Sequence, residues 1–398
     1  MNHSANRSVL ISGASIAGPS LAFWLDRYGF EVTVVEKSSA LRSGGYAIDI
    51  RGTALDVVDR MGLLPRLRAA NVGTRKISFL DKEGILICSI DLEAISGGAK
   101  DLDLEVRRGD LAEALYAPTH DNVEFVFNDS IAALDDDGDH VEVTFDSGVR
   151  RAFDLVIGAD GLHSNTRRLV FGPEEGFHRY LGYTFAVFSL PNDFGLAHEG
   201  VLWNVPGKAA VLYAHEPGER VYGLLAFTRE DPPFDAFRDP AAQRELVAAT
   251  FPEQVWHVPR LVEAMREADD LFFDIVSQIH LPAWSRGRVA LAGDAAHATS
   301  FQSGQGSSIA LCGGYMLAGE LARHADHAAA FAAYEQQMRP YAEQNQALAT
   351  AGGWIVTPAT RETLDARNRA MRDPATLTGA AHRAAHNGLV LPDYGNAG

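Results

Sequence analysis

The sequence predicts an α/β fold in which a parallel sheet flanked by helices carries an inserted antiparallel sheet and a helical C-terminal segment. Three observations predict it. Near the start, two apolar strands flank a glycine-bearing turn and an apolar-periodic helix. Residues 180–228 hold aromatic-rich apolar runs separated by Gly and Pro turns, as antiparallel strands do. Residues 327–387 have mostly helical spacing, with breaks predicted at Pro340, Gly352–Gly353 and Pro358.

The length of 398 residues allows two sizeable cores, or one large α/β core with an insertion. The formal net charge of −17 would repel phosphate backbones and anionic lipid, so we expect no nucleic-acid or membrane partner. A neutral or locally cationic small molecule fits better. Two cysteines, Cys88 and Cys312, leave no disulfide framework and no thiolate metal site, and we expect no metal.

The N-terminal residues lack the regions of a signal peptide, and no long uninterrupted apolar run suggests a transmembrane helix. We therefore expect a cytoplasmic protein, either a monomer or a homodimer.

The first unit runs from a short strand at residues 9–11 through the turn GASIAG, Gly13–Gly18, to a helix and a second strand that ends on Glu36. In a dinucleotide-binding β-α-β unit, the pyrophosphate lies at the helix N-terminus and an acid about 20 residues on binds the ribose. Ser15 stands where the fingerprint has its middle glycine, but serine is small and its hydroxyl can donate to a phosphate. The alternative is a strand-to-helix turn with no ligand. An acid at Glu36 favours FAD or NAD over NADP.

The loop at residues 41–62 places Arg42 and Arg51 on either side of Gly44–Gly45, ahead of a helix for which Thr53 is the predicted cap. Such a basic, flexible loop can reach an anionic cofactor. A surface loop with solvated arginines is the alternative.

A second motif, GADGLHSNTR, follows an apolar strand at residues 154–158. Asp160 can accept hydrogen bonds from a ribose or from backbone amides, Gly161 permits a sharp turn, and Arg167 lies on the same helix face as Ser164. An Asx-capped turn would look the same over four residues.

A third motif begins where a buried strand ends on Gly293–Asp294, and Gly304-Gln305-Gly306 then starts a helix of small residues that allow close backbone approach. The acid is placed to meet a cofactor hydroxyl.

The inserted sheet is a plausible substrate platform, and two helices are predicted after it, near 240–250 and 259–267. Its aromatic residues are individually better explained as core than as ligand contacts. We predict a discontinuous nucleotide-binding domain at 1–73, 100–176 and 272–325, a substrate domain at 74–99 and 177–271, and a helical segment at 326–398.

Together the three motifs resemble those of the group A flavoprotein aromatic hydroxylases, single-component FAD monooxygenases with the para-hydroxybenzoate hydroxylase type of fold and a Rossmann-like FAD-binding domain. Order and spacing match from near residue 9 to about 320. Within this family the chain is most similar to the tetracycline-inactivating monooxygenases, although related polyketide-tailoring hydroxylases share the same elements. The resemblance makes Arg108 and Asp49 FAD contacts and Arg42 a contact of the nicotinamide cofactor.

The motifs and the resemblance give the predicted cofactor-binding set: Gly13, Ser15, Ala17, Gly18, Glu36, Lys37, Arg42, Asp49, Arg108, Asp160, Gly161, Arg167, Gly293, Asp294, Gly304 and Gly306. The candidate substrate contacts are Phe185, Trp203, Tyr213 and Phe301. Phe301 stands where the family usually has proline and Ser308 where it has asparagine, and the resemblance places Phe301 near the reactive flavin ring.

The resemblance implies that NADPH or NADH reduces FAD, that O2 adds at flavin C4a, and that the resulting hydroperoxide hydroxylates an aromatic or polycyclic, tetracycline- or polyketide-like molecule. The flavin carries the chemistry, so no catalytic side chain is predicted. A Baeyer-Villiger-type or non-oxygenating flavin oxidoreductase is one alternative, and a non-catalytic flavin- or drug-binding protein is another.

Overall fold

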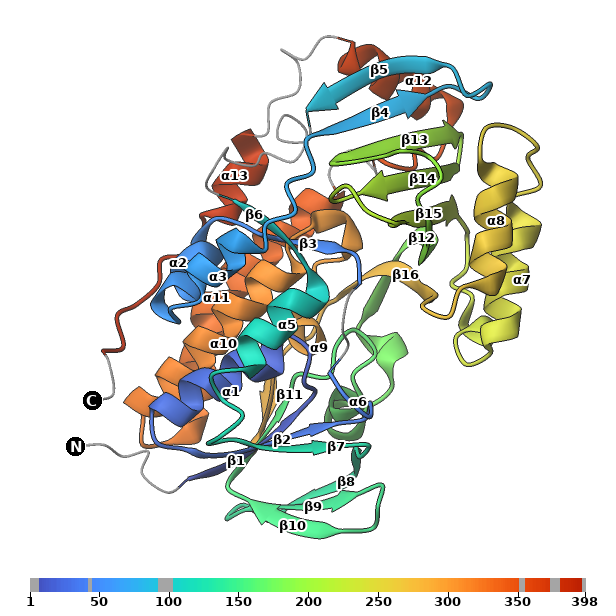
Figure 1. Cartoon of the computed structure of the whole chain (residues 1–398). Helices are drawn as coiled ribbons and strands as arrows, with labels where there is room; N and C mark the ends of the chain where they lie inside the picture. The colour runs from blue at the N-terminus through green and yellow to red at the C-terminus, as the bar shows by residue number, and fades with distance from the viewer. Residues whose placement is uncertain (1–6, 42–44, 92–102, 351–354, 373–379, 396–398) are drawn as a thin grey trace.

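The computed structural model describes residues 7–41, 45–91, 103–350, 355–372 and 380–395. A parallel sheet and an antiparallel sheet lie at opposite ends of the molecule, with a layer of helices beside the first (Figure 1). Arg42 and Gly352–Gly353 lie outside the described residues.

The parallel sheet confirms the predicted β-α-β unit. Its strands, in spatial order, are β17 (Ser285–Arg286), β18 (Val289–Leu291), β11 (Leu155–Gly158), β1 (Ser8–Ser12), β2 (Glu31–Glu36) and β7 (Glu124–Phe127), and only β17 pairs antiparallel. A three-stranded sheet packs on one face through a shared apolar cluster: β8 (Ile131–Asp136), β9 (Val141–Phe145) and β10 (Arg150–Phe153). The other face is covered by α1 (Ala17–Arg27), α5 (Arg108–Tyr116), α10 (Gly306–Arg323) and α11 (His327–Thr350) (Figure 1).

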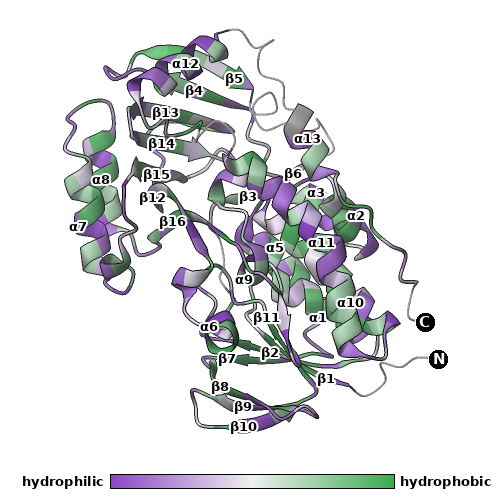
Figure 2. Cartoon of the chain, turned by 180° about the vertical axis from the view of Figure 1, so that it is seen from behind, coloured by the Kyte–Doolittle hydropathy of each residue, from purple (hydrophilic) through white to green (hydrophobic). Residues whose placement is uncertain are grey.

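The helix α10 is central to this layer. Its residues Ser308–Leu321 are buried, and Figure 2 shows it as mostly hydrophobic. The predicted break at Pro340 is wrong, because α11 continues through that residue. Proline removes one hydrogen bond and clashes with the preceding turn. The buried face of α11, with Tyr334, Met338 and Tyr341, offsets that cost by packing in the core around α10.

A two-stranded ribbon, β3 (Ala47–Ile50) with β6 (Leu104–Arg107), joins the two ends of the molecule, and α2 (Thr53–Arg60) and α3 (Leu64–Ala69) pack beside it. Thr53 does not cap α2 as predicted. It is the first helical residue, and its hydroxyl donates instead to the carbonyl of Leu389, 2.9 Å away. A contact from the far end of the chain thus replaces the local cap.

The antiparallel sheet confirms the predicted inserted strands. Its order is β16 (Phe272–Ile279), β12 (His178–Pro191), β15 (Arg220–Thr228), β14 (Lys208–Ala214), β13 (Glu199–Val205), β4 (Lys76–Leu80) and β5 (Leu86–Asp91), with only β13 and β4 parallel. The sequence groups residues 272–279 with the nucleotide-binding domain, but in the structure they form β16, which pairs with β12 in this sheet. Burial alone does not tell which sheet an apolar strand joins.

The two predicted helices, α7 (Pro240–Thr250) and α8 (Val258–Glu267), cover one face of this sheet. Segment 355–371, with α12 (Arg361–Met371), packs on the opposite face, and α13 (Ala380–His386) packs on α11. Short helical turns are α6 (Asn165–Phe171), α9 (Asp294–His297), η1 (Glu174–Gly176), η2 (Phe234–Ala236) and η3 (Phe301–Ser303). Within the described parts of the chain, no helix combines the length and apolarity that crossing a bilayer needs.

Substitutions of Trp203 test the packing of α7 and α8 on the antiparallel sheet. Its ring is fully buried in the cluster with Val258 and Leu261, and its indole N–H donates to the carbonyl of Lys82 at 3.2 Å. Trp203→Ala should lower the free energy of unfolding by about 3–5 kcal/mol, because it removes a large ring from a packed core. Urea unfolding of this variant and of Trp203→Phe measures the effect, and Trp203→Phe should lose clearly less. A loss within 0.5 kcal/mol of zero, about that of a surface substitution, would contradict this packing.

Candidate active site

The three sequence motifs meet at the carboxyl edge of the parallel sheet. Gly13 follows β1, Glu36 ends β2, Asp160 follows β11 and Gly293 follows β18, and these four strands are neighbours. In open α/β sheets, ligands bind in the crevice outside the carboxyl ends of the strands. The structure therefore gathers all three motifs into one candidate site.

The turn after β1 leaves no room for a side chain at either of its two glycines. Gly13 has φ +107°, and a Cβ there would lie 2.5 Å from the carbonyl oxygen of Ala159. A Cβ on Gly18 would lie 1.9 Å from the Gly13 oxygen. Glu36 accepts a hydrogen bond from the Ala14 amide at 2.9 Å, so the acid braces the turn. Both glycines are thus required by backbone approach.

Arg108 comes from a different element to the same turn. It is the first residue of α5, and its guanidinium donates to Ser15 Oγ at 2.7 Å. A cation beside the helix N-terminus of α1 offers two attractions to an anionic group. Lys37, by contrast, is exposed just beyond the end of β2.

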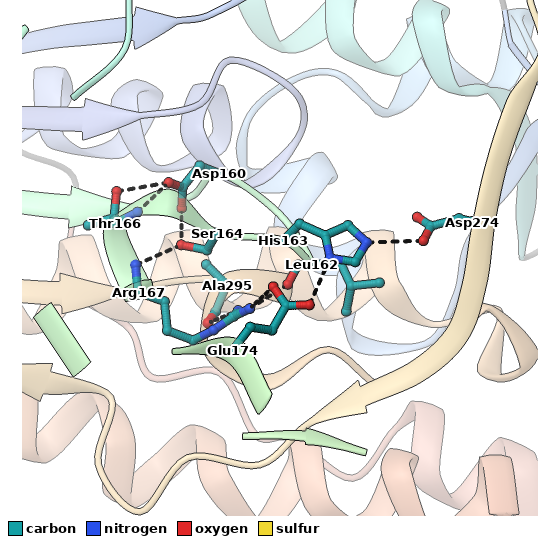
Figure 3. Close-up of polar contacts among 9 residues, drawn as sticks. All are labelled: Asp160, Leu162, His163, Ser164, Thr166, Arg167, Glu174, Asp274 and Ala295. Carbon is teal, nitrogen blue, oxygen red and sulfur yellow. Dashed lines mark hydrogen bonds and ion pairs between the residues drawn. The ribbon is translucent and has the colours of Figure 1, made fainter. Parts of the chain in front are cut away.

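Asp160 shows the capped turn that the sequence left as an alternative. Its carboxylate accepts from the Thr166 amide at 2.8 Å and the Thr166 hydroxyl at 2.9 Å, and also from Ser164 Oγ (Figure 3). Ser164 in turn caps α6 by accepting from the Arg167 amide at 2.9 Å. Asp160 thereby shapes the loop that holds Gly161, whose φ is +85°.

Arg167 is fully buried and is held by protein groups. Its guanidinium donates to the carbonyls of Leu162 at 2.6 Å and Ala295 at 3.0 Å, and it pairs with Glu174 at 3.0 Å (Figure 3). Burial lowers its pKa, and the Glu174 charge opposes that change. Arg167 therefore ties the second motif to the third through the residue that follows Asp294.

His163 connects the same loop to the antiparallel sheet. Nδ1 lies 2.8 Å from Glu174 and Nε2 lies 3.1 Å from Asp274 on β16 (Figure 3). Burial by itself would lower the pKa of His163, but hydrogen bonds to Asp274 and Glu174 and their charges raise it to about 9. The imidazolium is thus a bridge between the two sheets.

Asp294 is the first residue of α9, directly after the turn that follows β18. Its side chain is accessible to solvent, but many protein atoms lie close around the carboxylate. Their desolvation of the charged form raises the pKa of Asp294, and the charge of Arg108 opposes this shift. Gly293 has φ +60°, and a Cβ there would lie 2.9 Å from Ala17 Cβ. A Cβ on Gly306 would lie 3.7 Å from Asp294 Oδ1, so the acid also faces the N-terminus of α10.

Asp49 and Ser308 lie on the other side of this segment. Asp49 pairs with Arg51 at 2.7 Å, and a Cβ on Gly304 would lie 3.1 Å from Asp49 Oδ2. Ser308 Oγ accepts from the Arg51 amide at 3.1 Å. Ser308 thus joins α10 to β3, which is a contact that its position in the sequence did not predict.

Three of the four candidate substrate residues lie in one cluster on the sheet face away from α7 and α8: Phe185, Tyr213 and Phe301. The Phe185 and Phe301 rings stack with centroids 4.4 Å apart. The fourth candidate, Trp203, does not belong to this cluster, because it lies on the opposite face, in the core under α7 and α8. Residues alternate between faces along a strand, so a one-residue difference in register separates Trp203 from the cluster. Sequence reasoning missed Tyr46 and Phe272, which complete the cluster.

The polar groups at this edge of the sheet fit a dinucleotide. The glycine turn leads into the N-terminus of α1, Arg108 supplies positive charge, and Glu36 and Asp294 supply acceptors for hydroxyls. Gln305 Oε1, at the start of α10, is buried without a hydrogen-bond partner among the described residues. An unpaired buried acceptor is costly, so a donor from a bound group is expected there.

Comparison with known proteins decides the family. Residues 6–349 match the family described as FAD binding domain. The chain belongs to this family of FAD-dependent monooxygenases. A flavin-dependent monooxygenase from an unknown prokaryotic organism is 37% identical over 98% of this chain and 99% of its own. An uncharacterised protein of Mycobacterium tuberculosis is 44% identical over 88% of this chain and 93% of its own.

Solved structures agree with this assignment. The crystal structure of tetracycline destructase Tet(55) superposes with a TM-score of 0.84 at 35% identity, covering 99% of this chain and 100% of that one. Tet(51) gives a TM-score of 0.84 at 31% identity, covering 97% and 99%. The predicted fold class and the family resemblance are thereby confirmed.

The glycine turn gives a direct test of the FAD site. Gly18→Ala should weaken FAD binding by tenfold or more, an estimate of about 1.4 kcal/mol, because its Cβ must displace the Gly13 carbonyl. Flavin fluorescence titration of the deflavinated protein measures the affinity. Gly218→Ala, where a Cβ meets nothing within 4 Å, is the matched control. Equal affinities in the two variants would refute the role of the turn.

The His163 bridge predicts a pH dependence of stability. A raised pKa means that its contribution is complete below the unfolded value of 6.5 and is lost as pH rises through about 9. The pKa of Glu174 is lowered, although burial opposes this, by its hydrogen bond and charge contact with His163 and by Arg167, so its share is lost as pH falls below its ordinary 4.5. Urea unfolding of the wild type and His163→Gln should therefore differ most between pH 5 and 6.5, a window of about 1.5 pH units. A difference that stays constant up to pH 10, roughly a unit above that pKa, would contradict the bridge.

Proposed function

We propose that the protein is an FAD-dependent monooxygenase that uses NADPH or NADH and O2 to hydroxylate an aromatic or polycyclic, tetracycline- or polyketide-like small molecule. One observation carries the proposal. The segment that begins with Asp294 at the FAD-domain crevice continues to Phe301, whose ring stacks on Phe185 of the antiparallel sheet. The cofactor side and an aromatic surface are therefore joined within eight residues.

Different residues at the carboxyl edge of the parallel sheet would bind different parts of FAD. Glu36 would accept from the ribose, while Ser15 and Arg108 would bind the pyrophosphate and Asp294 the ribityl chain. Bound FAD supplies two-electron transfer from the nicotinamide and the activation of O2. The chain's own task is to position the substrate and to exclude water from the aromatic side. Asp160 and Arg167 act on this site through the loops that they hold.

The substrate class is supported from two sides. The cluster with Phe185, Tyr213 and Phe301 offers ring faces on which a planar molecule can stack. The net charge of −17 disfavours strongly anionic ligands. The structures of Tet(55) and Tet(51) belong to proteins named tetracycline destructases, which makes tetracycline the first compound to test.

Only the turn at Gly13–Gly18 matches a dinucleotide fingerprint in the sequence. We infer that NADPH or NADH binds transiently in a groove without a domain of its own, as Arg42 in the resemblance suggests.

The proposal predicts the outcome of an activity screen. The purified protein should be yellow, and tetracycline, an anthraquinone or a phenol should stimulate its NAD(P)H oxidation and yield a product heavier by about 16 mass units, that of one oxygen atom. Mass spectrometry and absorbance at 340 nm, approximately the reduced-nicotinamide band, give the two readouts. Oxidation without an oxygenated product would instead indicate a non-oxygenating enzyme, and bound flavin without turnover a binding protein.

A substitution at Asp294 tests the role of this carboxylate in binding FAD. Asp294→Asn should weaken FAD binding roughly 10- to 100-fold, because hydrogen bonds to a charged acceptor contribute about 1.5–3 kcal/mol. Asp269→Asn is the control, since Asp269 is exposed and lies just beyond the end of α8, the helix on the sheet face opposite the aromatic cluster. Flavin titration measures both, and unchanged affinity in Asp294→Asn would remove Asp294 from the site.

A further inference from the structure

Four rings from separate segments close around one another beside the third motif. Phe301 stacks on Phe185 with centroids 4.4 Å apart and planes at 24°. Tyr46 meets Phe301 edge-on at 5.8 Å, and Phe272 lies 5.9 Å from both Tyr46 and Phe185. Phe185 is only 2% exposed, so the Phe301 ring covers its face. We call these four residues the ring cluster.

The backbone that carries Phe301 is strained. Ser300 has φ +86° and ψ +157°, a conformation that is nearly restricted to glycine. Gly304, at the other end of the turn, has φ +62°. Strain of this kind persists only where the surroundings impose it, and it occurs often at ligand clamps and switches. The contacts of residues 300–304 therefore offset the strain at Ser300 in this conformation.

The same five residues contain polar atoms that lack partners. Ser300 Oγ and Gln302 Nε2 are buried, and neither has a hydrogen-bond partner within the described chain. The turn is held instead by Ser303 Oγ, which donates to the Ser300 carbonyl at 2.8 Å. Buried unpaired donors and acceptors raise the free energy of this conformation. A second conformation that pairs them is therefore within reach.

We propose that Phe301 covers an aryl subsite on Phe185, and that a planar aromatic ring of the substrate takes the place of the Phe301 ring when residues 300–304 move aside as a lid. The inference rests on the proposed function, because the incoming ring is that of the substrate. Phe185, Tyr46 and Phe272 remain as the walls of the subsite. When the lid moves, Gln302 Nε2, unpaired in the covering conformation, can donate to an oxygen acceptor on the incoming ring, such as that of a phenol, enol or quinone.

This exchange predicts opposite effects of two substitutions. In Phe301→Ala, no ring competes for Phe185, so planar aromatic ligands should bind roughly three- to tenfold more tightly, the range of one aromatic pair. In Ser300→Gly, the strain of the covering conformation is relieved, so that conformation is favoured and the same ligands should bind roughly five- to 100-fold more weakly. If Phe301 were only a wall of the site or only structural, tighter binding in Phe301→Ala together with weaker binding in Ser300→Gly would not be expected.

The test is calorimetric titration of the FAD-loaded protein with tetracycline and with 2-naphthol, without NAD(P)H, so that no turnover occurs. Phe234→Ala is the control for loss of a phenylalanine ring, since Phe234 is 47% exposed in η2, outside the ring cluster. It should bind as the wild type does. If Phe301→Ala folds poorly, the Ser300→Gly result alone decides.

Weaker binding in Phe301→Ala, tighter or unchanged binding in Ser300→Gly, or no binding of 2-naphthol to Phe301→Ala would overturn the lid. An activity assay run in parallel keeps the two proposals apart. Hydroxylated product from the wild type without the opposite shifts leaves the monooxygenase and removes the lid. Opposite shifts without any oxygenated product leave the aryl subsite and remove the monooxygenase.

Discussion

The segment from Gly293 to Gly306 touches both sheets, and the geometry of the site depends on this double attachment. At one end, Gly293 passes so close to Ala17 that a Cβ would lie 2.9 Å from that side chain. At the other end, Phe301 stacks on Phe185. Between them Arg167 donates to the Ala295 carbonyl. A chain held at three points places Asp294 with little freedom, which is what a preorganised cofactor site requires.

The polar network around Arg167 makes this attachment stiff but sensitive. A buried guanidinium without partners would be very unfavourable, and here two carbonyls and Glu174 pair with its two terminal nitrogens. Glu174 also pairs with His163, and His163 pairs with Asp274 on β16. Asp274 lies opposite Phe185 in the register of β16 with β12. One network of ion pairs and hydrogen bonds therefore connects the loop after β11, the third motif and the aromatic face. Removing one charge of this network is expected to shift the positions of the other groups.

Much of the cofactor half could be predicted from the sequence, because its signals are local. The turn at Gly13–Gly18, the strand that ends on Glu36 and the strand that ends at Gly293–Asp294 are each recognised from a few neighbouring residues. The inserted strands are predicted by aromatic-rich apolar runs and the Gly and Pro turns between them. The failures are of a different kind. Trp203, a candidate substrate contact, lies in the core under α7 and α8, and residues 272–279, grouped with the nucleotide-binding domain, pair with β12 in the antiparallel sheet. At Thr53 and Pro340, tertiary contacts override the local rules for helix caps and breaks. The strain at Ser300 and the ring cluster leave no local signal, since they arise only when distant segments meet.

The most direct measurement is a crystal structure of the protein grown with FAD and tetracycline. We expect the pyrophosphate at the N-terminus of α1 beside Ser15 and Arg108, the ribityl chain at Asp294, and the flavin ring between α10 and the sheet face that carries Phe185. FAD bound elsewhere, for example in the cavity lined by Asp56, Arg68 and Arg383, would contradict it.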